Sequence, residues 1–174
     1  FEDQPLTIEL SDPDGLAVTG QISEAAKKLG NGGLQLNGTS VYAQSANELT
    51  ISTGSITLEA WFYPNTNASG GEDKIVQIAG PAYHSAYLGW QDGQVLFGLI
   101  SGDNDSWYKA WTDPGQVSLN EWHHIAATSD GAMMRVYVDG IEVKSVDMGN
   151  IASFSGKVDV GAEVSTASRF ASGW

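Results

Sequence analysis

The sequence predicts an all-β domain built as a two-sheet antiparallel sandwich. Short segments rich in β-branched and aromatic residues recur along the chain, and turn-forming residues separate them. Several of these turns contain Asn-Gly or Asp-Gly, pairs that adopt the positive φ values of tight β-hairpins. The chain has 21 Gly but only 8 Lys and Arg in its 174 residues, a composition that suits a turn-rich β protein better than a helical one.

The individual strands are predicted from apolar runs that end at turn signals. They are Leu34–Leu36, Thr57–Tyr63, Val95–Ile100, Trp107–Trp111, Trp122–Thr128, Met133–Val138 and Ile141–Val146. Pro64 ends the second of these runs, and Asp113-Pro114-Gly115 ends the fourth. At most one short helix is expected, at Ser23–Leu29, with Ser23 as its N-cap.

The run Met133–Val138 shows the clearest alternation. Met134, Val136 and Val138 occupy every second position, and side chains alternate between the two faces of a strand. These three residues are therefore predicted to face the core. Asp139-Gly140 follows directly and supplies a tight turn into the next strand, so the region is predicted to form a half-buried β-hairpin.

Length and composition favour one globular domain over residues 1–174. The absence of Cys excludes disulfides, a thiol nucleophile and Cys-type zinc sites. No apolar run approaches the roughly 20 residues that span a bilayer, so membrane insertion is not expected.

The net charge of −13 restricts the possible partners. Nucleic acid is excluded, because phosphate recognition needs clusters of Lys and Arg that this chain lacks. The same negative field disfavours acidic polysaccharides, whereas neutral glycans and cations are favoured.

Several short motifs occur together across residues 34–173. The longest combination is Glu121-Trp122-His123-His124-Ile125-Ala126, Ser129-Asp130-Gly131 and Arg135-Val136-Tyr137-Val138-Asp139-Gly140. Upstream stand Leu34-Gln35-Leu36-Asn37-Gly38-Thr39 and Ile56-Thr57-Leu58-Glu59-Ala60-Trp61-Phe62, and the stretch from Gly161 to Gly173 follows. With these motifs the chain resembles the laminin-G-like, concanavalin-A-like lectin/glucanase jelly-roll domains.

The resemblance implies a jelly-roll sandwich in an extracellular or cell-surface protein, expected here to be bacterial. It places Trp61 and Trp122 in the core and makes His124 a hydrogen-bonded structural residue. The family normally continues with a further strand where this chain stops at Trp174, and its first strand is short here. The resemblance therefore implies either a domain truncated at both terminal strands or a different role for Gln4–Leu10.

Catalysis is not expected. Glycoside hydrolases on this fold carry a compact acidic motif of the type E-x-D-x-x-E, which holds two carboxyl groups about 5–5.5 Å apart. The nearest acidic pairs here are Asp12/Asp14, Glu72/Asp73 and Asp103/Asp105, and all lie in turn-like sequence. Ser and His occur without a G-x-S-x-G element. The domain is predicted to be non-catalytic, at most an appendage of a polysaccharide-degrading enzyme.

Calcium is the metal that the sequence favours. Ser11-Asp12-Pro13-Asp14-Gly15 and Gly102-Asp103-Asn104-Asp105-Ser106 combine carboxylates with a bend, as calcium loops do. Asp12, Asp14 and Asp103 are the predicted ligands of a structural calcium ion, and many laminin-G-like domains hold one near a sandwich edge. The alternative is that both segments are metal-free turns, since Asx- and Gly-rich turns are common.

His123 and His124 invite a metal interpretation, with Glu121 nearby as a further ligand. Adjacent residues on a strand point to opposite faces, so the two imidazoles cannot easily share one ion. A structural role is the better prediction.

Exposed aromatic rings beside polar side chains are typical of sugar-binding sites. The predicted ligand contacts are Trp107, Trp111, Trp90, Tyr83, Asp103, Asn104 and Asp105. Trp107 and Trp111 fall on one face of a regular strand, with Lys109 between them. The alternative is that these two indoles belong to the core.

Two functions remain open on this evidence. The first is a calcium-dependent carbohydrate-binding module that binds a neutral glycan or polysaccharide. The second is an adhesion, protein-interaction or spacer domain within a larger bacterial surface protein. Exposed Trp residues near the loop ends would favour the glycan, whereas a flat polar surface would favour the spacer.

Overall fold

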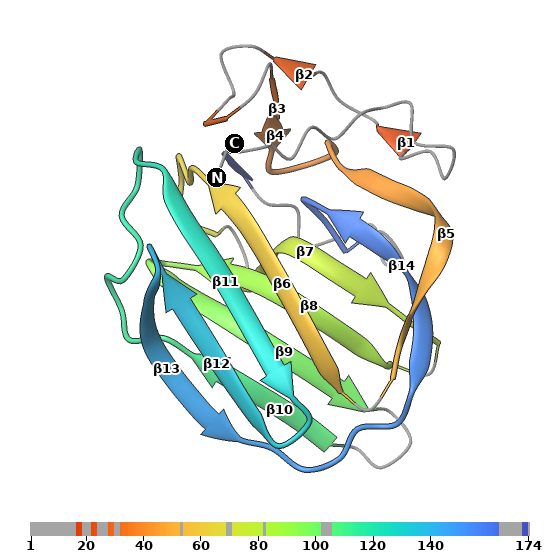
Figure 1. Cartoon of the computed structure of the whole chain (residues 1–174). Coiled ribbons are helices and arrows are strands. Elements are labelled where there is room, and N and C mark those ends of the chain that lie inside the picture. The colour runs from red at the N-terminus through yellow and green to blue at the C-terminus, as the bar shows by residue number, and fades with distance from the viewer. Residues whose placement is uncertain are drawn as a thin grey trace.

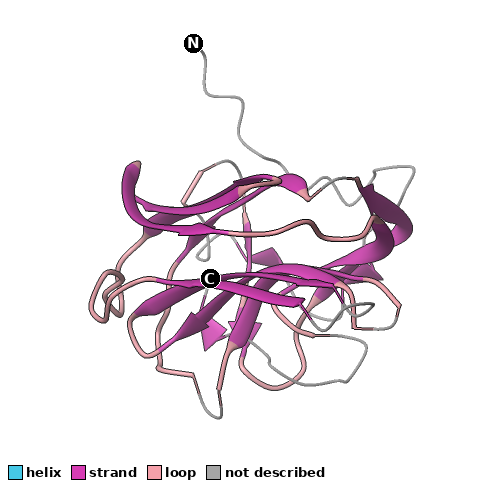
Figure 2. Cartoon of the chain, turned by 90° about the horizontal axis from the view of Figure 1, so that it is seen from below, coloured by secondary structure: helices cyan, strands magenta, loops and turns pink. Residues whose placement is uncertain are grey.

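The chain folds as a sandwich of two antiparallel sheets, as predicted (Figures 1 and 2). The computed structural model describes residues 17–18, 22–23, 28–29, 32–52, 54–68, 71–81, 83–101, 106–163 and 172–173. Within these ranges every regular element is a strand, and there is no helix long and apolar enough to cross a membrane.

The larger sheet has seven strands in the order β1-β5-β14-β7-β8-β9-β10. Their bounds are β1 Ala17–Val18, β5 Ala43–Ile51, β14 Phe154–Val160, β7 Asp73–Ala79, β8 Ser85–Gln91, β9 Gln94–Ser101 and β10 Ser106–Trp111. Every pairing in this sheet is antiparallel.

The smaller sheet has four strands in the order β13-β12-β11-β6. Their bounds are β13 Ile141–Asp147, β12 Met133–Val138, β11 His123–Asp130 and β6 Ser55–Phe62. Two short ladders complete the fold: β15 (Ser172–Gly173) with β4 (Leu36–Asn37), and β2 (Ile22–Ser23) with β3 (Gly33–Leu34).

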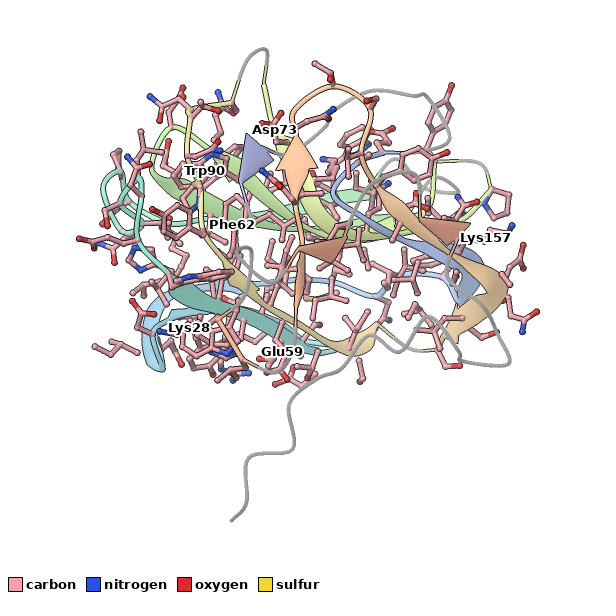
Figure 3. All side chains as sticks on the ribbon, turned by 90° about the horizontal axis from the view of Figure 1, so that it is seen from above. Lys28, Glu59, Phe62, Asp73, Trp90 and Lys157 are labelled. Atoms are coloured by element: carbon pink, nitrogen blue, oxygen red, sulfur yellow. The ribbon has the colours of Figure 1, made fainter. Side chains whose placement is uncertain are left out.

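The core fills the space between the two sheets. It contains Phe62 from the smaller sheet and Trp90 from the larger one, whose ring centroids lie 5.9 Å apart in an edge-to-face arrangement (Figure 3). Phe97 and Met134 are also fully buried between the layers. Burial of such large apolar side chains supplies the main driving force for folding in a chain without disulfides.

The predicted hairpin is confirmed. Met134, Val136 and Val138 are buried, and β11, β12 and β13 are consecutive neighbours. At the β12–β13 turn, Asp139 has a φ of 51° and Gly140 a φ of 81°, the pattern of a type I′ turn.

The predicted helix at Ser23–Leu29 is wrong at its described positions. Ser23 lies in β2 and pairs with Gly33, while Lys28 and Leu29 lie in a bend. Residues 24–27 are outside the described residues. A helix of only two turns forms few hydrogen bonds to offset the unfavourable free energy of helix nucleation. Strand pairing therefore overrides the local helix propensity.

Candidate functional site

The outer face of the larger sheet, opposite the core, carries an aromatic patch at its β10 edge. In β10, Tyr108 and Ala110 pack into the core, so Trp107, Lys109 and Trp111 project from the outer face. Trp107 is 57% exposed. Trp111 is half-buried against a small apolar cluster of Tyr87, Leu96 and Ile100 on the same face. Trp107 is thus a surface residue, whereas Trp111 is only partly available to a ligand.

Lys109 of this patch forms an ion pair with a carboxylate from outside β10. Glu72, which immediately precedes β7, accepts from Lys109 Nζ at 2.6 Å and from Lys74 Nζ at 3.0 Å. The hydroxyl of Tyr87 donates to the same carboxylate at 3.0 Å. Lys74 Nζ also lies 3.4 Å from the centroid of the Tyr87 ring, a cation–π contact. The network ties β7, β8 and β10 together beside Trp107.

Burial and neighbouring charges act in opposite directions on this network. Burial raises the pKa of Glu72, but hydrogen bonds and charges from Lys109 and Lys74 outweigh it, and the net pKa is below the ordinary value. Burial lowers the pKa of Lys74, partly offset by Glu72 and Glu163. The negative charges of Glu72 and Glu163 therefore balance the positive charges of the two lysines, and the polar part of the site is nearly neutral.

Gly98 makes this arrangement possible. It lies between Lys109 and Tyr87 in the sheet register, and the Tyr87 ring crosses directly above it. A Cβ at Gly98 would lie only 2.3 Å from Cζ of Tyr87. Only glycine at this position lets the ring lie flat and direct its hydroxyl to Glu72.

The other two predicted aromatic contacts, Trp90 and Tyr83, lie in different environments. Trp90 is only 1% exposed and lies in the core, so its prediction as a ligand contact is wrong. It shares the inward face of β8 with Ala86 and Leu88, and its indole N–H donates to the Thr66 carbonyl at 3.4 Å. Tyr83 is 85% exposed in the loop between β7 and β8.

The predicted polar contacts and calcium ligands cannot be placed. Asp103, Asn104 and Asp105, and likewise Asp12 and Asp14, lie outside the described residues. Ser101 and Ser106, the described residues on either side of 102–105, pair with each other next to Trp107. Among the residues that the structure does describe, no cluster of three or more His, Asp or Glu could hold a metal ion.

Two residues of the family motifs have roles other than those expected. Trp61, predicted in the core, is 40% exposed on the outer face of the smaller sheet, where Lys28 Nζ lies 4.9 Å from its ring centroid. Lys28 and Glu59 mark this side of the molecule in Figure 3. His124 is half-exposed, with its ring centroid 5.2 Å from that of Trp61 and Nε2 3.5 Å from Glu59.

The buried histidine is His123. Its Nδ1 lies 2.8 Å from Asp139 Oδ2, and its Nε2 lies 2.9 Å from Ser118 Oγ. This order resembles a Ser-His-Asp triad, but the Ser118 hydroxyl donates its single proton to Glu121 at 2.8 Å, and the Ser118 N–H donates to Nε2 at 3.2 Å. The cluster thus fixes the 118–122 loop against the hairpin turn.

Trp122, the other indole predicted in the core, is partly buried. Its ring stands edge-to-face to Tyr63 at a centroid distance of 5.5 Å. The Asn120 N–H donates to the Pro64 carbonyl at 2.8 Å beside it. Trp122 therefore helps to hold the 118–122 loop against the end of β6.

Solved structures with the same fold share little sequence with this chain. The botulinum neurotoxin serotype G binding domain is 18% identical, with a TM-score of 0.63 over 86% of this chain and 39% of that one. Domains LG4-5 of the mouse laminin alpha1 chain are 15% identical, with a TM-score of 0.56 over 80% and 37%. The CBM40 of Ruminococcus gnavus IT-sialidase, solved with alpha2,3 sialyllactose, is 12% identical, with a TM-score of 0.59 over 69% and 71%. The chain thus spans well under half of the first two.

A comparison with curated protein sequences gave no match. A family model described as the concanavalin A-like lectin/glucanases superfamily matches residues 37–173. The match includes β5 to β14 and all the motifs from Ile56 to Gly140. The chain belongs to the laminin-G-like domains of the concanavalin A-like lectin/glucanase superfamily.

Proposed function

We propose that this domain is a non-catalytic carbohydrate-binding module whose ligand lies on the outer face of the larger sheet at β10. The observation that carries the proposal is the 57% exposed indole of Trp107 beside the Lys109–Glu72 ion pair. A pyranose ring stacks on such an indole, while its hydroxyl groups donate to a carboxylate and accept from an ammonium group.

The charges of the site support a neutral sugar rather than an acidic one. Lys74 and Lys109 are both engaged by Glu72, and Glu163 adds a second carboxylate near Lys74. No excess positive charge remains among these four residues for an anionic sugar, and the net charge of −13 repels one. The CBM40 structure, solved with alpha2,3 sialyllactose, supports glycan binding on this fold in general.

Calcium dependence is part of the proposal. Asp12, Asp14 and Asp103 offer the oxygen ligands that calcium prefers. Residues 102–105 connect Ser101 to Ser106, which pair beside Trp107, so we propose that a calcium ion held by Asp103 also brings Asn104 and Asp105 to the sugar. Chelation would then weaken glycan binding as well as stability.

The family supports an extracellular setting. Laminin-G-like domains are typical of extracellular proteins, and we place this domain outside the cell or on its surface, in a bacterial protein with further domains. An adhesin and a polysaccharide-degrading enzyme that carries the domain as an appendage both fit.

A second function, protein-mediated adhesion, is favoured by the exposed Ile141 in β13 and Leu49 in β5, which are not part of the β10 patch. Similar structures include a neurotoxin binding domain and laminin domains. An adhesive domain would bind its protein partner whether or not Trp107 is present.

A glycan-array screen of wild type, Trp107→Ala and Ile141→Ala, with and without calcium, tests these alternatives. Ile141→Ala is the matched control, because Ile141 is 68% exposed but belongs to the smaller sheet. We expect the wild type to bind a neutral glycan. This binding should be lost in Trp107→Ala and kept in Ile141→Ala. Absence of any glycan binding, or equal binding by both variants, would overturn the proposal.

A further inference from the structure

Tyr83 is presented to solvent in an unfavourable backbone conformation. Its side chain is 85% exposed, more than any other large hydrophobic side chain in the described part of the molecule. Its φ is 63°, in the left-handed region that bulky residues rarely adopt. Both features cost free energy. The surrounding structure must therefore hold the residue in place.

The loop that carries Tyr83 is fixed from inside. The Gly80 N–H donates to the His84 carbonyl at 2.9 Å, and the His84 N–H donates to the Pro81 carbonyl at 3.1 Å. The imidazole of His84 is buried, lies 2.9 Å from the same Pro81 carbonyl through Nδ1, and packs against Phe154 with ring centroids 5.6 Å apart. Tyr83 is thus an exposed ring on a rigid support.

The sheet register places the loop that carries this ring at the same end of the larger sheet as the candidate sugar site. Ser85 pairs with Ile100, and Ile100 pairs with Trp107. The β7–β8 loop with Tyr83 and the start of β10 with Trp107 are therefore at the same end of the larger sheet. Two strand spacings separate β8 from β10, about 10 Å. A strand separation of this size suits neighbouring parts of a longer ligand better than a single sugar ring.

We propose that Tyr83 forms a second sugar subsite, and that the ligand is an extended neutral oligosaccharide or polysaccharide chain rather than a single terminal sugar. The inference depends on the proposed glycan site at Trp107. A tyrosine side chain has only two rotatable torsions and loses little conformational entropy on binding, so its ring contributes directly to affinity. Affinity therefore increases with ligand length until both Trp107 and Tyr83 are covered.

The test is a length series. The probes are neutral gluco-, xylo-, manno- and galacto-oligosaccharides from disaccharide to octasaccharide, measured by calorimetry with wild type, Tyr83→Ala, Tyr83→Phe and Trp107→Ala. Tyr83→Ala is expected to lose about two- to tenfold in affinity for the long members and nothing for the shortest member that binds. Trp107→Ala weakens all lengths, and Tyr83→Phe keeps the ring and the wild-type affinity.

The outcomes separate the two proposals. If long and short oligosaccharides bind with equal affinity, or if Tyr83→Ala binds every length like wild type, the extended site is wrong and the glycan site at Trp107 stands. If no oligosaccharide binds, or if Trp107→Ala is without effect, the proposed function itself fails. Thermal melting of Tyr83→Gly is a separate check of the strain, since glycine relieves a positive φ and is expected to raise the Tm.

Discussion

The imidazole of His123 donates from Nδ1 to the carboxylate of Asp139 at 2.8 Å, joining the first residue of β11 to the turn after β12. The other oxygen of Asp139 accepts from the backbone N–H of His124 at 2.9 Å. One carboxylate thus serves both the type I′ turn and the adjacent strand. This explains in physical terms why the Trp-His-His and Asp-Gly motifs occur together.

Replacement of Asp139 tests this connection. Burial raises the pKa of Asp139, but the hydrogen bonds from His123 and from the His124 N–H outweigh it, so the folded-state pKa lies below the ordinary value of 3.8. The stabilisation is present above that value and is lost as the pH falls through the folded-state pKa. Asp139→Asn, which tolerates the positive φ, is expected to cost about 0.5–1.5 kcal/mol at neutral pH in urea denaturation, because solvent screens the interactions of a side chain that is 48% exposed. The difference between variant and wild type should shrink in acid; a constant difference would contradict the assignment.

Glu72 is expected to support both the fold and the site. Glu72→Gln leaves the buried ammonium of Lys74 without its carboxylate partner and weakens the hold on Lys109. Because Glu72 is partly accessible to solvent, the expected loss is about 1–3 kcal/mol in chemical denaturation. The folded-state pKa of Glu72 is below 4.5, so the loss should be complete at neutral pH and should diminish as the wild-type carboxylate is protonated.

Glu142→Gln is the control for Glu72→Gln. Glu142 is exposed, and its carboxylate has only a 3.4 Å contact with the Tyr137 hydroxyl. We expect it to be nearly neutral. Equal stability losses in the two variants would show that Glu72 has no special role in the network.

Gly98 is expected to be intolerant of a side chain. Gly98→Ala places a methyl group 2.3 Å from Cζ of Tyr87, and the ring must leave its position above the strand. We expect a loss of about 1–3 kcal/mol and a Tm decrease of a few degrees per kcal/mol, measured by calorimetry. Gly89→Ala is the matched control on the same face, because its nearest contact, Asp73 O, is 3.3 Å away. A similar Tm for both variants would rule out the role of Gly98.

The sequence predicted the hairpin better than the tryptophans, and the difference has a physical cause. Strand β12 alternates between buried and half-exposed residues, so its pattern shows which face is inside. Strand β8 is buried at almost every position, because the apolar cluster around Tyr87 covers its outer face. Its sequence therefore carries no sign of which face holds the core, and the prediction of Trp90 as a ligand contact could not be checked against an alternating pattern.

The Glu72 network could not be predicted from local sequence. Glu72 and Lys109 are far apart along the chain, and only the order β7-β8-β9-β10 brings them together. Alternation within β10 did place Trp107, Lys109 and Trp111 on one face. Which residues contact that face depends on the order of the strands in the sheet, and no short sequence motif encodes that order.

Calcium is expected to stabilise the fold. At a free calcium concentration of about 100 Kd, one site adds roughly 2.7 kcal/mol, which corresponds to a Tm increase of about 5–11 °C for a domain of this size. Differential scanning calorimetry with calcium and with EDTA measures the difference. Asp12→Ala and Asp103→Ala then identify the contributing loop. Identical melting curves in calcium and EDTA would refute the site.

Trp107 and Trp111 are expected to respond differently to truncation, because only one of them is fully at the surface. Trp107→Ala should weaken glycan binding by about 0.5–1.5 kcal/mol beyond the area lost, with little change in Tm. Trp111 packs on Tyr87, Leu96 and Ile100, so Trp111→Ala should lose both affinity and stability. Trp90→Ala is the reference for truncation of a core indole, with an expected loss of about 3–5 kcal/mol in the free energy of unfolding measured by denaturation.

Isothermal titration with a glycan identified on the array, together with urea denaturation of the three variants, separates binding from folding. Trp107→Ala is the decisive variant, because the Trp107 indole is exposed to solvent and its removal leaves the core intact. A Trp107→Ala protein that melts far below wild type would make Trp107 a structural residue. A variant with wild-type stability and full affinity would move the ligand away from β10 altogether.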